Sequence, residues 1–263
     1  MAAPYWWIED KNRTVLYDIG NAQSLKRGGT KKDFSLTALL TKNGKYIKGI
    51  GLCSEKTFEI EVNLKALNGH DTYMNVNRDI LISKLLNDEI YLYEKTGEGL
   101  ERYCRVYCTT MGDETIDYQR GLIKKSFSLL SPSGVLKSST TTTYNLTIAD
   151  STNTKLVVTN PGNIPCPFRI SFDPNAEESY FKVENNFNSN GFKFQKTYFQ
   201  ANIVVDYDTE DNSLLIDNVA VNVSNYKVAG KPIILNPGTN DLYIQHSGNG
   251  SADFTIEFEA LYV

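Results

Sequence analysis

A strict alternation of apolar with polar or charged residues is the feature that most constrains the fold of this chain. In residues 57–65 the apolar positions are Phe58, Ile60, Val62 and Leu64, and each is followed by a polar or charged residue. Successive side chains of a strand point to opposite faces of its sheet, so the pattern predicts a strand that is buried on one face. The same alternation recurs near the C-terminus, with Phe254, Ile256, Phe258 and Ala260 as its apolar positions.

Short runs rich in strand-forming residues occur through most of the chain. They predict strands at residues 90–93, 102–108, 122–129, 144–148, 156–159, 168–172, 203–207, 214–216 and 219–223. Gly, Asn and Asp separate the runs at short spacing, which is typical of antiparallel sandwiches or barrels. With 263 residues, 41% of them hydrophobic, the chain can bury two medium cores. We therefore expect a mainly β fold with two antiparallel β-sandwich domains.

One segment has helical rather than strand periodicity. From Asn77 to Asn87 the apolar residues recur at helical spacing, as Leu81, Ile82, Leu85 and Leu86. Asn77 is a suitable N-cap, and Asp79 would lie in the first turn, where the helix dipole favours a negative charge. The segment predicts a single short helix.

A small, polar stretch from Ser131 to Thr143 lacks hydrophobic periodicity. Such composition is typical of a linker. It predicts an N-terminal domain of residues 1–137, which contains the helix, and a C-terminal domain of residues 138–263 that consists of strands.

The net charge and the N-terminal residues indicate which kinds of partner to expect. The 27 Lys and Arg against 31 Asp and Glu give a net charge of -4, which offers no general attraction to nucleic acid or to an anionic membrane. Met1 to Ile8 has neither a basic segment nor a long apolar run. We expect no contact with nucleic acid, no membrane insertion, and maturation in the cytoplasm.

The cysteines do not predict a disulfide framework or a metal site. Cys53, Cys104, Cys108 and Cys166 are few and scattered. Cys104 and Cys108 would share one strand face with Val106, and no second Cys/His pair completes a tetrahedral set. Packing against the core is the interpretation we adopt for this pair.

Catalytic motifs are not recognisable in the sequence. His70 and His246 are the two histidines, and both stand among turn residues, which predicts a surface-loop position for each. Motifs for a nucleophile elbow, a zinc protease helix or a phosphate-binding loop do not occur. We therefore expect no catalytic residue, no cofactor site and no enzymatic activity.

An acidic run, Asp206 to Asn212, resembles a calcium-binding loop because alternate carboxylates supply oxygen ligands, and Asp217 takes the twelfth position. Its sixth position is Asp211, where such loops need Gly for a sharp turn, and the apolar residues 214–216 follow directly. A solvated hairpin tip between two strands is the favoured interpretation, so no metal site is expected.

Aromatic residues comprise 16 Tyr, 12 Phe and 2 Trp, and Tyr5, Trp6 and Trp7 stand together. Tyr and Trp are favoured where an apolar body is buried and a polar tip finds a partner, as at protein interfaces and sugar sites. The cluster has two interpretations: docking against another chain or another part of this one, and packing in the core.

Several segments, taken in order, carry a resemblance to a known family. They are residues 57–65, the helix near Arg78 to Leu86, residues 90–93 and 122–129, Leu156 to Pro165 with Phe168 to Phe172, residues 203–208 and 214–221, and Leu235 to Asn240 with the strands after it. In this order they resemble the phage distal tail protein, or Dit-like, family. The turn Pro237 to Asn240, with the pattern Pro-Gly-x-Asn, is the most specific piece.

The resemblance implies a ring-forming N-terminal β-sandwich and a galectin-like C-terminal β-sandwich. It also implies a structural virion protein at the tail tip, assembled in the host cytoplasm into a homo-oligomeric ring, a hexamer in the family. The ring would connect the tail tube protein to the hub, baseplate or receptor-binding apparatus. We expect residues 1–137 to form the ring and residues 138–263 to project from it.

Two other functions remain open at this level. Galectin-like sandwiches and surface aromatics can bind sugars, which makes a carbohydrate-binding module the main alternative. A hydrolase with scattered carboxylates is another, because paired Asp or Glu can do acid/base chemistry without a readable motif.

Overall fold

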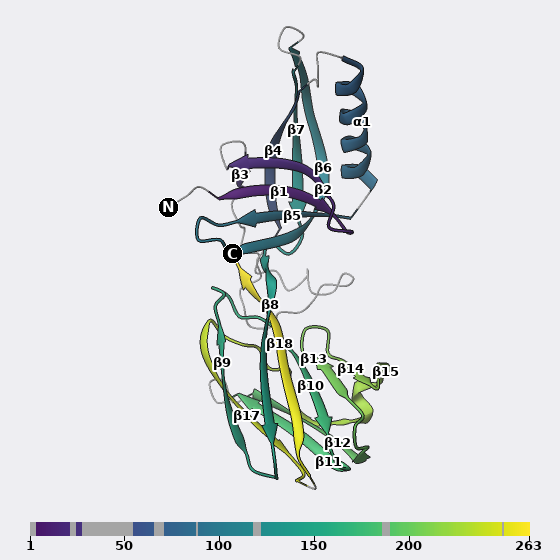
Figure 1. Cartoon of the computed structure of the whole chain (residues 1–263), viewed down its shortest axis with the longest axis vertical. Helices are drawn as coiled ribbons and strands as arrows, with labels where there is room; N and C mark the ends of the chain where they lie inside the picture. Colours follow the sequence, from purple (N-terminus) through teal and green to yellow (C-terminus); the bar gives the residue numbers. More distant parts are fainter. Residues whose placement is uncertain are drawn as a thin grey trace. The chain divides into compact units, whose positions relative to one another are not determined.

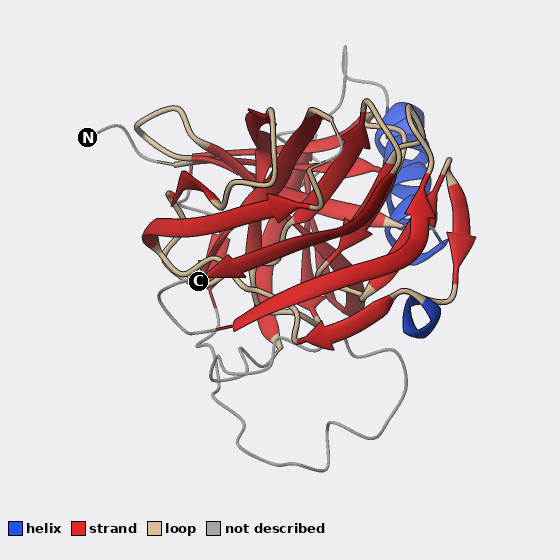
Figure 2. Cartoon of the chain, turned by 90° about the horizontal axis from the view of Figure 1, so that it is seen from below, coloured by secondary structure: helices blue, strands red, loops and turns tan. Residues whose placement is uncertain are grey.

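The computed structural model describes residues 4–21, 25–27, 55–65, 71–87, 89–117, 122–185, 190–248 and 250–263. Strands, red in Figure 2, make up most of this part of the chain, beside one α-helix and a short 3₁₀ turn in blue. The chain divides into two compact units. The first takes the described residues up to Ser139 together with Val263, and the second takes Thr140 to Tyr262. The prediction of a mainly β fold is confirmed.

The first unit contains one helix and seven strands within the described residues. They are β1 (Tyr5–Asp10), β2 (Val15–Asn21), β3 (Leu25–Arg27), β4 (Lys56–Lys65), α1 (Asp71–Asn87), β5 (Ile90–Lys95), β6 (Glu101–Asp117) and β7 (Leu122–Ser131). One sheet has the order β2-β1-β5-β6, the other has β3-β4-β7-β6, and all these pairs are antiparallel.

Strand β6 belongs to both sheets of the first unit. Its first half pairs with β5, and from Tyr107 onward it pairs with β7. The register shifts between Cys108 and Thr110 and again between Met111 and Glu114. Such bulges bend a strand and increase its twist, which lets one strand pass from one sheet to the next.

The core of the first unit lies between these two sheets. Trp6 of β1 and Phe58 of β4 are fully buried, and their rings lie 6.1 Å apart. On β4 the predicted alternation is confirmed where side chains are described, because Phe58, Ile60 and Val62 are buried while Glu59 and Glu61 are exposed. Side chains of residues 63–65 lie outside the described part.

Helix α1 packs against β4, β6 and β2 of the same unit (Figure 1). Leu81 and Leu85 are buried, as the helical spacing predicts. The predicted start was wrong, because the helix begins at Asp71 and Asn77 lies inside it. Residues 71–77 contain neither Pro nor Gly, so nothing in them interrupts a helix that continues from Asp71 into the apolar stretch. Asn77 is therefore not an N-cap, and Asp79 is not in the first turn.

The stretch predicted to be a linker is mostly strand. Strand β8 (Leu136–Ile148) includes the run of Ser and Thr and neighbours β6 and β18 in its sheet. Thr is β-branched and favours strands even where the hydrophobic alternation is weak. The division between the two units, after Ser139, lies inside this strand, and so does the boundary proposed after residue 137.

The second unit holds β8 from Thr140 onward and ten further strands within the described residues. They are β9 (Thr154–Asn160), β10 (Arg169–Pro174), β11 (Glu178–Asn185), β12 (Asn190–Phe199), β13 (Val205–Asp208), β14 (Ser213–Ile216), β15 (Val219–Val221), β16 (Lys227–Gly230), β17 (Gly238–His246) and β18 (Ala252–Tyr262), with the 3₁₀ turn η3 (Val223–Asn225) between β15 and β16.

These strands form two sheets that pack face to face. One has the order β15-β14-β13-β10-β18-β8, and the other has β16-β12-β11-β17-β9. Phe172 of β10 and Phe181 of β11, both fully buried, stack across the layer at 4.7 Å. On β18 the four predicted apolar positions from Phe254 to Ala260 are buried. The unit is an antiparallel β-sandwich.

Two asparagine side chains shape the turns of the second unit that carry the family resemblance. Asn240 is buried and bonds back to Asn236, accepting from its N–H at 2.9 Å and donating to its carbonyl at 2.8 Å. Asn160 likewise donates to the carbonyls of Ile164 and Leu235, at 3.2 and 3.1 Å. These bonds satisfy backbone groups in the turns and explain why the Asn positions are specific.

Candidate interaction surface

The outer face of the β1-β5-β6 sheet in the first unit carries a regular grid of large polar and aromatic side chains. Each row of the grid takes one residue from β1, one from β5 and one from β6, paired directly across the sheet. The rows are Tyr5–Lys95–Glu101, Trp7–Tyr93–Tyr103 and Glu9–Tyr91–Arg105. We call these nine residues the aromatic face.

Alternation along β1 explains how the Tyr5–Trp7 cluster divides. Trp6 and Ile8 point into the core and are fully buried, so their neighbours Tyr5, Trp7 and Glu9 must point outward. The core-packing interpretation therefore holds for Trp6, and docking stays a prediction for the two outward-facing residues. Trp6 packs in the core, while Tyr5, which is 37% exposed, and the half-buried Trp7 belong to the outer face.

The middle row forms a continuous stack of rings. Trp7 and Tyr93 lie 5.2 Å apart and within 15° of parallel, and Tyr93 and Tyr103 lie 5.5 Å apart and within 26° of parallel. The guanidinium of Arg13, from the turn after β1, lies 5.2 Å from the centre of the Tyr93 ring and 5.5 Å from that of Tyr103. Tyr93 is only 3% exposed as a result.

Charged groups surround this stack. Arg105 lies 3.3 Å from Glu89, which also accepts a hydrogen bond from the Tyr91 hydroxyl at 2.5 Å. That hydrogen bond, with a smaller effect of burial, raises the pKa of Tyr91. Lys95 pairs with Glu101 at 3.0 Å. The surface therefore combines aromatic area with charges of both signs.

The ring geometry decides which kind of partner suits the aromatic face. Sugar sites commonly stack a pyranose on an open ring face, but here the faces of Trp7, Tyr93 and Tyr103 are turned toward one another and toward Arg13. Tyr, Trp and Arg are the residues most enriched in protein interfaces and their hot spots. The face is suited to contact with protein.

Helix α1 provides a second exposed surface in the same unit. Val76, Ile80 and Leu86 on its outward side are each about half exposed, at 48%, 52% and 51%. Arg78 on the same helix pairs with Glu114 of β6 at 2.9 Å, and this anchors the helix to the sheet. Grouped exposed apolar side chains on a helix are typical of a contact surface.

The sequence analysis singled out only the β1 residues of the aromatic face, Tyr5 and Trp7. Tyr91, Tyr93, Tyr103 and Arg13 were not recognised as part of it, although Tyr91 and Tyr93 alternate with the buried Leu92. That alternation could have placed both tyrosines on an outer face. It could not have shown that β1 and β6 are the neighbours of β5.

The histidine prediction was wrong for His246. This residue ends β17, is completely buried, and its Nδ1 lies 3.1 Å from the carboxylate of Glu178, which is also buried. The turn residues lie after His246, which is itself the last residue of a strand, so their presence did not indicate its position. His70 lies outside the described residues.

The acidic run forms the predicted hairpin between β13 and β14. Its carboxylates are used locally: Asp206 pairs with Arg169 at 2.7 Å, Asp208 accepts from the N–H of Glu210 at 2.7 Å, and Asp211 accepts from the N–H of Ser213 at 3.0 Å. These bonds shape the turn.

The cysteines of β6 share one face of the strand, as predicted. Cys104 is buried and Cys108 is half-buried, with the fully buried Val106 between them. Burial raises the pKa of Cys104 to about 12. Cys166 is also buried, and Cys53 lies outside the described residues.

Within the described ranges, His, Cys, Asp and Glu side chains form no group of three or more that could hold a metal ion. No helix in this part of the chain has the length and apolar character needed to cross a membrane.

Comparison with known proteins gives a structural match without a sequence match. No family model and no curated protein matches the sequence. The chain superposes on the Dit protein (gp 19.1) of phage SPP1, described as a paradigm of hub adsorption apparatus in phages that infect Gram-positive bacteria. The TM-score is 0.65 at 10% identity, over 97% of this chain and 98% of that one. A chain of the activated phage P2 baseplate with Ca gives 0.42 at 12% identity, over 98% and 99%. The chain thus has the fold of the SPP1 Dit protein.

Proposed function

We propose that this protein is a structural component of a phage tail tip, where it forms a ring that connects the tail tube to the baseplate or receptor-binding apparatus. The observation that carries the proposal is the fold, which follows that of a phage hub protein through nearly the whole chain and both units. A binding role without catalysis, and a virion location at the tail tip, belong to the same proposal.

The surfaces of the first unit support a ring of identical copies. A closed ring needs two different contact surfaces on each copy, because each subunit meets one neighbour with each surface. The aromatic face and the outward side of α1 are two such surfaces on separate elements. We propose that they contact each other between neighbouring copies, in a hexamer by resemblance to the Dit-like family.

Residues 1–137 hold both surfaces, so the proposal assigns the ring to this part of the chain. Residues 138–263 then project from the ring as a galectin-like sandwich and meet other tail-tip proteins. The tail tube protein would bind one side of the ring.

Light scattering and negative-stain microscopy of the full-length protein test this function. We expect a ring-shaped oligomer that the variants Trp7→Ala and Ile80→Asp each convert to monomers while circular dichroism remains that of a β protein. Tyr144→Ala is the control, because Tyr144 stacks on Phe258 in the second unit at 6.4 Å. A wild-type protein that remains monomeric at high concentration contradicts the proposal, and so does a ring that both variants leave intact.

A further inference from the structure

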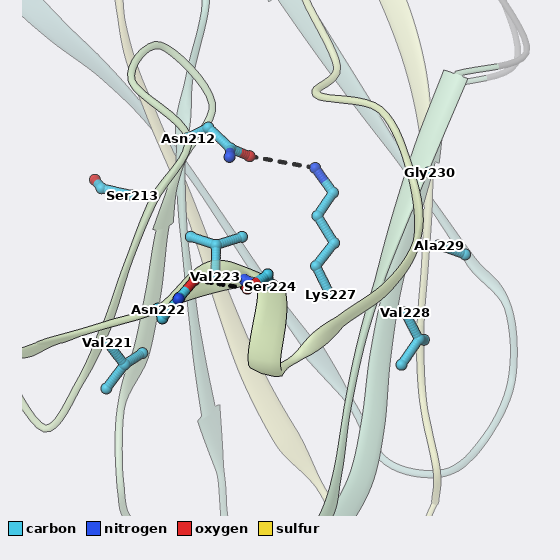
Figure 3. A pocket seen from close by; sticks show the side chains of 10 residues that line it. All are labelled: Asn212, Ser213, Val221, Asn222, Val223, Ser224, Lys227, Val228, Ala229 and Gly230. Carbon is cyan, nitrogen blue, oxygen red and sulfur yellow. Dashed lines mark hydrogen bonds between the residues drawn. The ribbon is translucent and has the colours of Figure 1, made fainter.

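The second unit has an open cavity of about 670 Å³, lined in part by β15 and β16, which are edge strands of its two sheets. Its walls come from the β13-β14 hairpin, β15, the 3₁₀ turn η3 and β16, as Figure 3 shows. The lining residues are Asn212, Ser213, Val221, Asn222, Val223, Ser224, Lys227, Val228, Ala229 and Gly230. This cavity is distinct from the aromatic face, and nothing in the proposed ring uses it.

Lys227 is the one charged residue in the lining. Its ammonium donates to Oδ1 of Asn212 at 3.3 Å, as Figure 3 shows. It also donates to the hydroxyl of Tyr207 at 3.1 Å. Both partners are neutral. No carboxylate among the described residues lies within 4.0 Å of this ammonium, and the side chain is half-buried. Burial of this group lowers the pKa of Lys227.

Tyr207 holds the ammonium in place as a neutral phenol. Burial, together with the nearby carboxylates of Asp208 and Asp211, raises the pKa of Tyr207. Its hydroxyl donates to Oδ1 of Asn212 at 2.7 Å and so leaves its oxygen to accept from Lys227. A Lys ammonium has three N–H donors, and these two bonds leave one for a ligand.

The remaining lining combines polar and apolar groups. Ser213, Ser224 and the amide nitrogens of Asn212 and Asn222 can bond to hydroxyls, while the methyl groups of the three valines present apolar area. A half-buried positive charge with no carboxylate within 4.0 Å among the described residues favours an anion. A sugar ring, with apolar C–H faces and several hydroxyls, matches the valine methyl groups and the polar Asn and Ser side chains of the lining.

We propose that this cavity binds an anionic sugar, with Lys227 bonding to its carboxylate or phosphate and the Asn and Ser side chains bonding to its hydroxyls. The proposal concerns a site within the second unit and does not depend on ring assembly.

Titration of the full-length protein with four small probes tests the site. The probes are glucuronate, glucose 6-phosphate, neutral glucose and inorganic phosphate, followed by isothermal titration calorimetry and by amide chemical shifts of residues 221–230. We expect the two sugar acids to bind more tightly than either glucose or inorganic phosphate. Their relative affinities show whether the site prefers a carboxylate or a phosphate.

Three variants attribute the binding to Lys227. Lys227→Met removes the ammonium but keeps most of the stem, and it should weaken binding of the sugar acids by about tenfold or more, as expected for one charge-assisted hydrogen bond. Lys227→Arg should retain much of the affinity. Lys231→Met, at an exposed lysine outside the lining, should change nothing.

The proposal is overturned if glucose binds as well as the sugar acids, if inorganic phosphate binds as well as glucose 6-phosphate, or if Lys227→Met leaves the affinity unchanged. Absence of shifts at residues 221–230 at saturating probe also overturns it. Thermal unfolding of each variant distinguishes a lost contact from a lost fold.

Discussion

The carboxylate of Glu178 lies 3.1 Å from Nδ1 of His246, and neither side chain has any exposed surface. Glu178 also accepts the N–H groups of Gly248 and Gly250, at 2.9 and 3.2 Å. On its other side, Nε2 of His246 lies 3.3 Å from the carbonyl of Ile148 at the end of β8. The pair therefore ties β11, β17 and β8 together at one end of the second sandwich.

Loss of this pair should destabilise the second unit strongly. His246→Ala should lower the free energy of unfolding by about 3 kcal/mol, since it leaves a cavity and removes one of the partners of a buried carboxylate. Urea denaturation followed by far-UV circular dichroism measures the change in the free energy of unfolding. Thr239→Ala, at an exposed position of the same strand, serves as the control. Equal stability of the two variants would refute the structural role of the pair.

Asp10 should make stability depend on pH at the acidic end. The N–H of Thr14 bonds to its carboxylate at 3.0 Å and is the main reason that the pKa of Asp10 is lowered, with further contributions from the N–H of Asn12 and from Lys84. A lowered pKa in the folded state means that this stabilisation is complete above the unfolded pKa of about 4 and is lost as the pH falls through the folded value.

The variant Asp10→Asn isolates that contribution. Compared with wild type, it should be less stable at pH 7, and the difference should shrink toward pH 2 to 3 in urea titrations. Glu98→Gln, at an exposed carboxylate in another turn, provides the reference. A stability difference that stays constant across this range would show that the Asp10 carboxylate has no such effect.

Gly230 should tolerate no side chain. It has a φ of +95°, and a Cβ added there would lie 1.8 Å from the carbonyl oxygen of Gly191 on the neighbouring strand β12. Gly238 has a similar φ of +84°, but an added Cβ would meet no atom within 4 Å. Gly238→Ala should therefore cost about 1 kcal/mol from backbone strain alone.

Gly230→Ala should cost clearly more than Gly238→Ala, because β16 must also move away from β12. Chemical denaturation of both variants gives the comparison. If the two substitutions prove equally destabilising, close approach of the strands is not what requires glycine at position 230.

Cys104 should resist alkylation in the folded protein. With its pKa raised to about 12 by burial, very little of Cys104 is a thiolate at pH 8, and only the thiolate reacts. Brief iodoacetamide treatment followed by peptide mass spectrometry should leave Cys104 unmodified and label the half-buried Cys108 slowly. Both should be labelled fully in urea. Rapid labelling of Cys104 in buffer would show that this part of β6 opens readily.

Local patterns in the sequence determined much of the fold. The alternation at Phe58 and at Phe254 predicted both the strands and their buried faces, because a period of two is a property of the strand itself. The shared face of Cys104 and Cys108 was predicted for the same reason. The hairpin at Asp206 to Asn212 was predicted from the apolar residues 214–216 that follow it and from the lack of Gly at its sixth position. Turn chemistry also identified Asn240, whose side chain closes its own turn.

Long-range contacts decided the rest. Nothing near Trp7 in the sequence indicates that Tyr93 and Tyr103 stand beside it, because the order and register of strands depend on which segments meet, and that information is not local. His246 looks like a loop residue until β8 and β11 enclose it, and the polar residues of β8 form a strand only because neighbouring strands pair with them. The sequence by itself determined the strands that alternate clearly, such as β4 and β18, and the faces they bury. The tertiary structure decided which strands are neighbours, and with that the aromatic face, the buried Glu178–His246 pair and the cavity at Lys227.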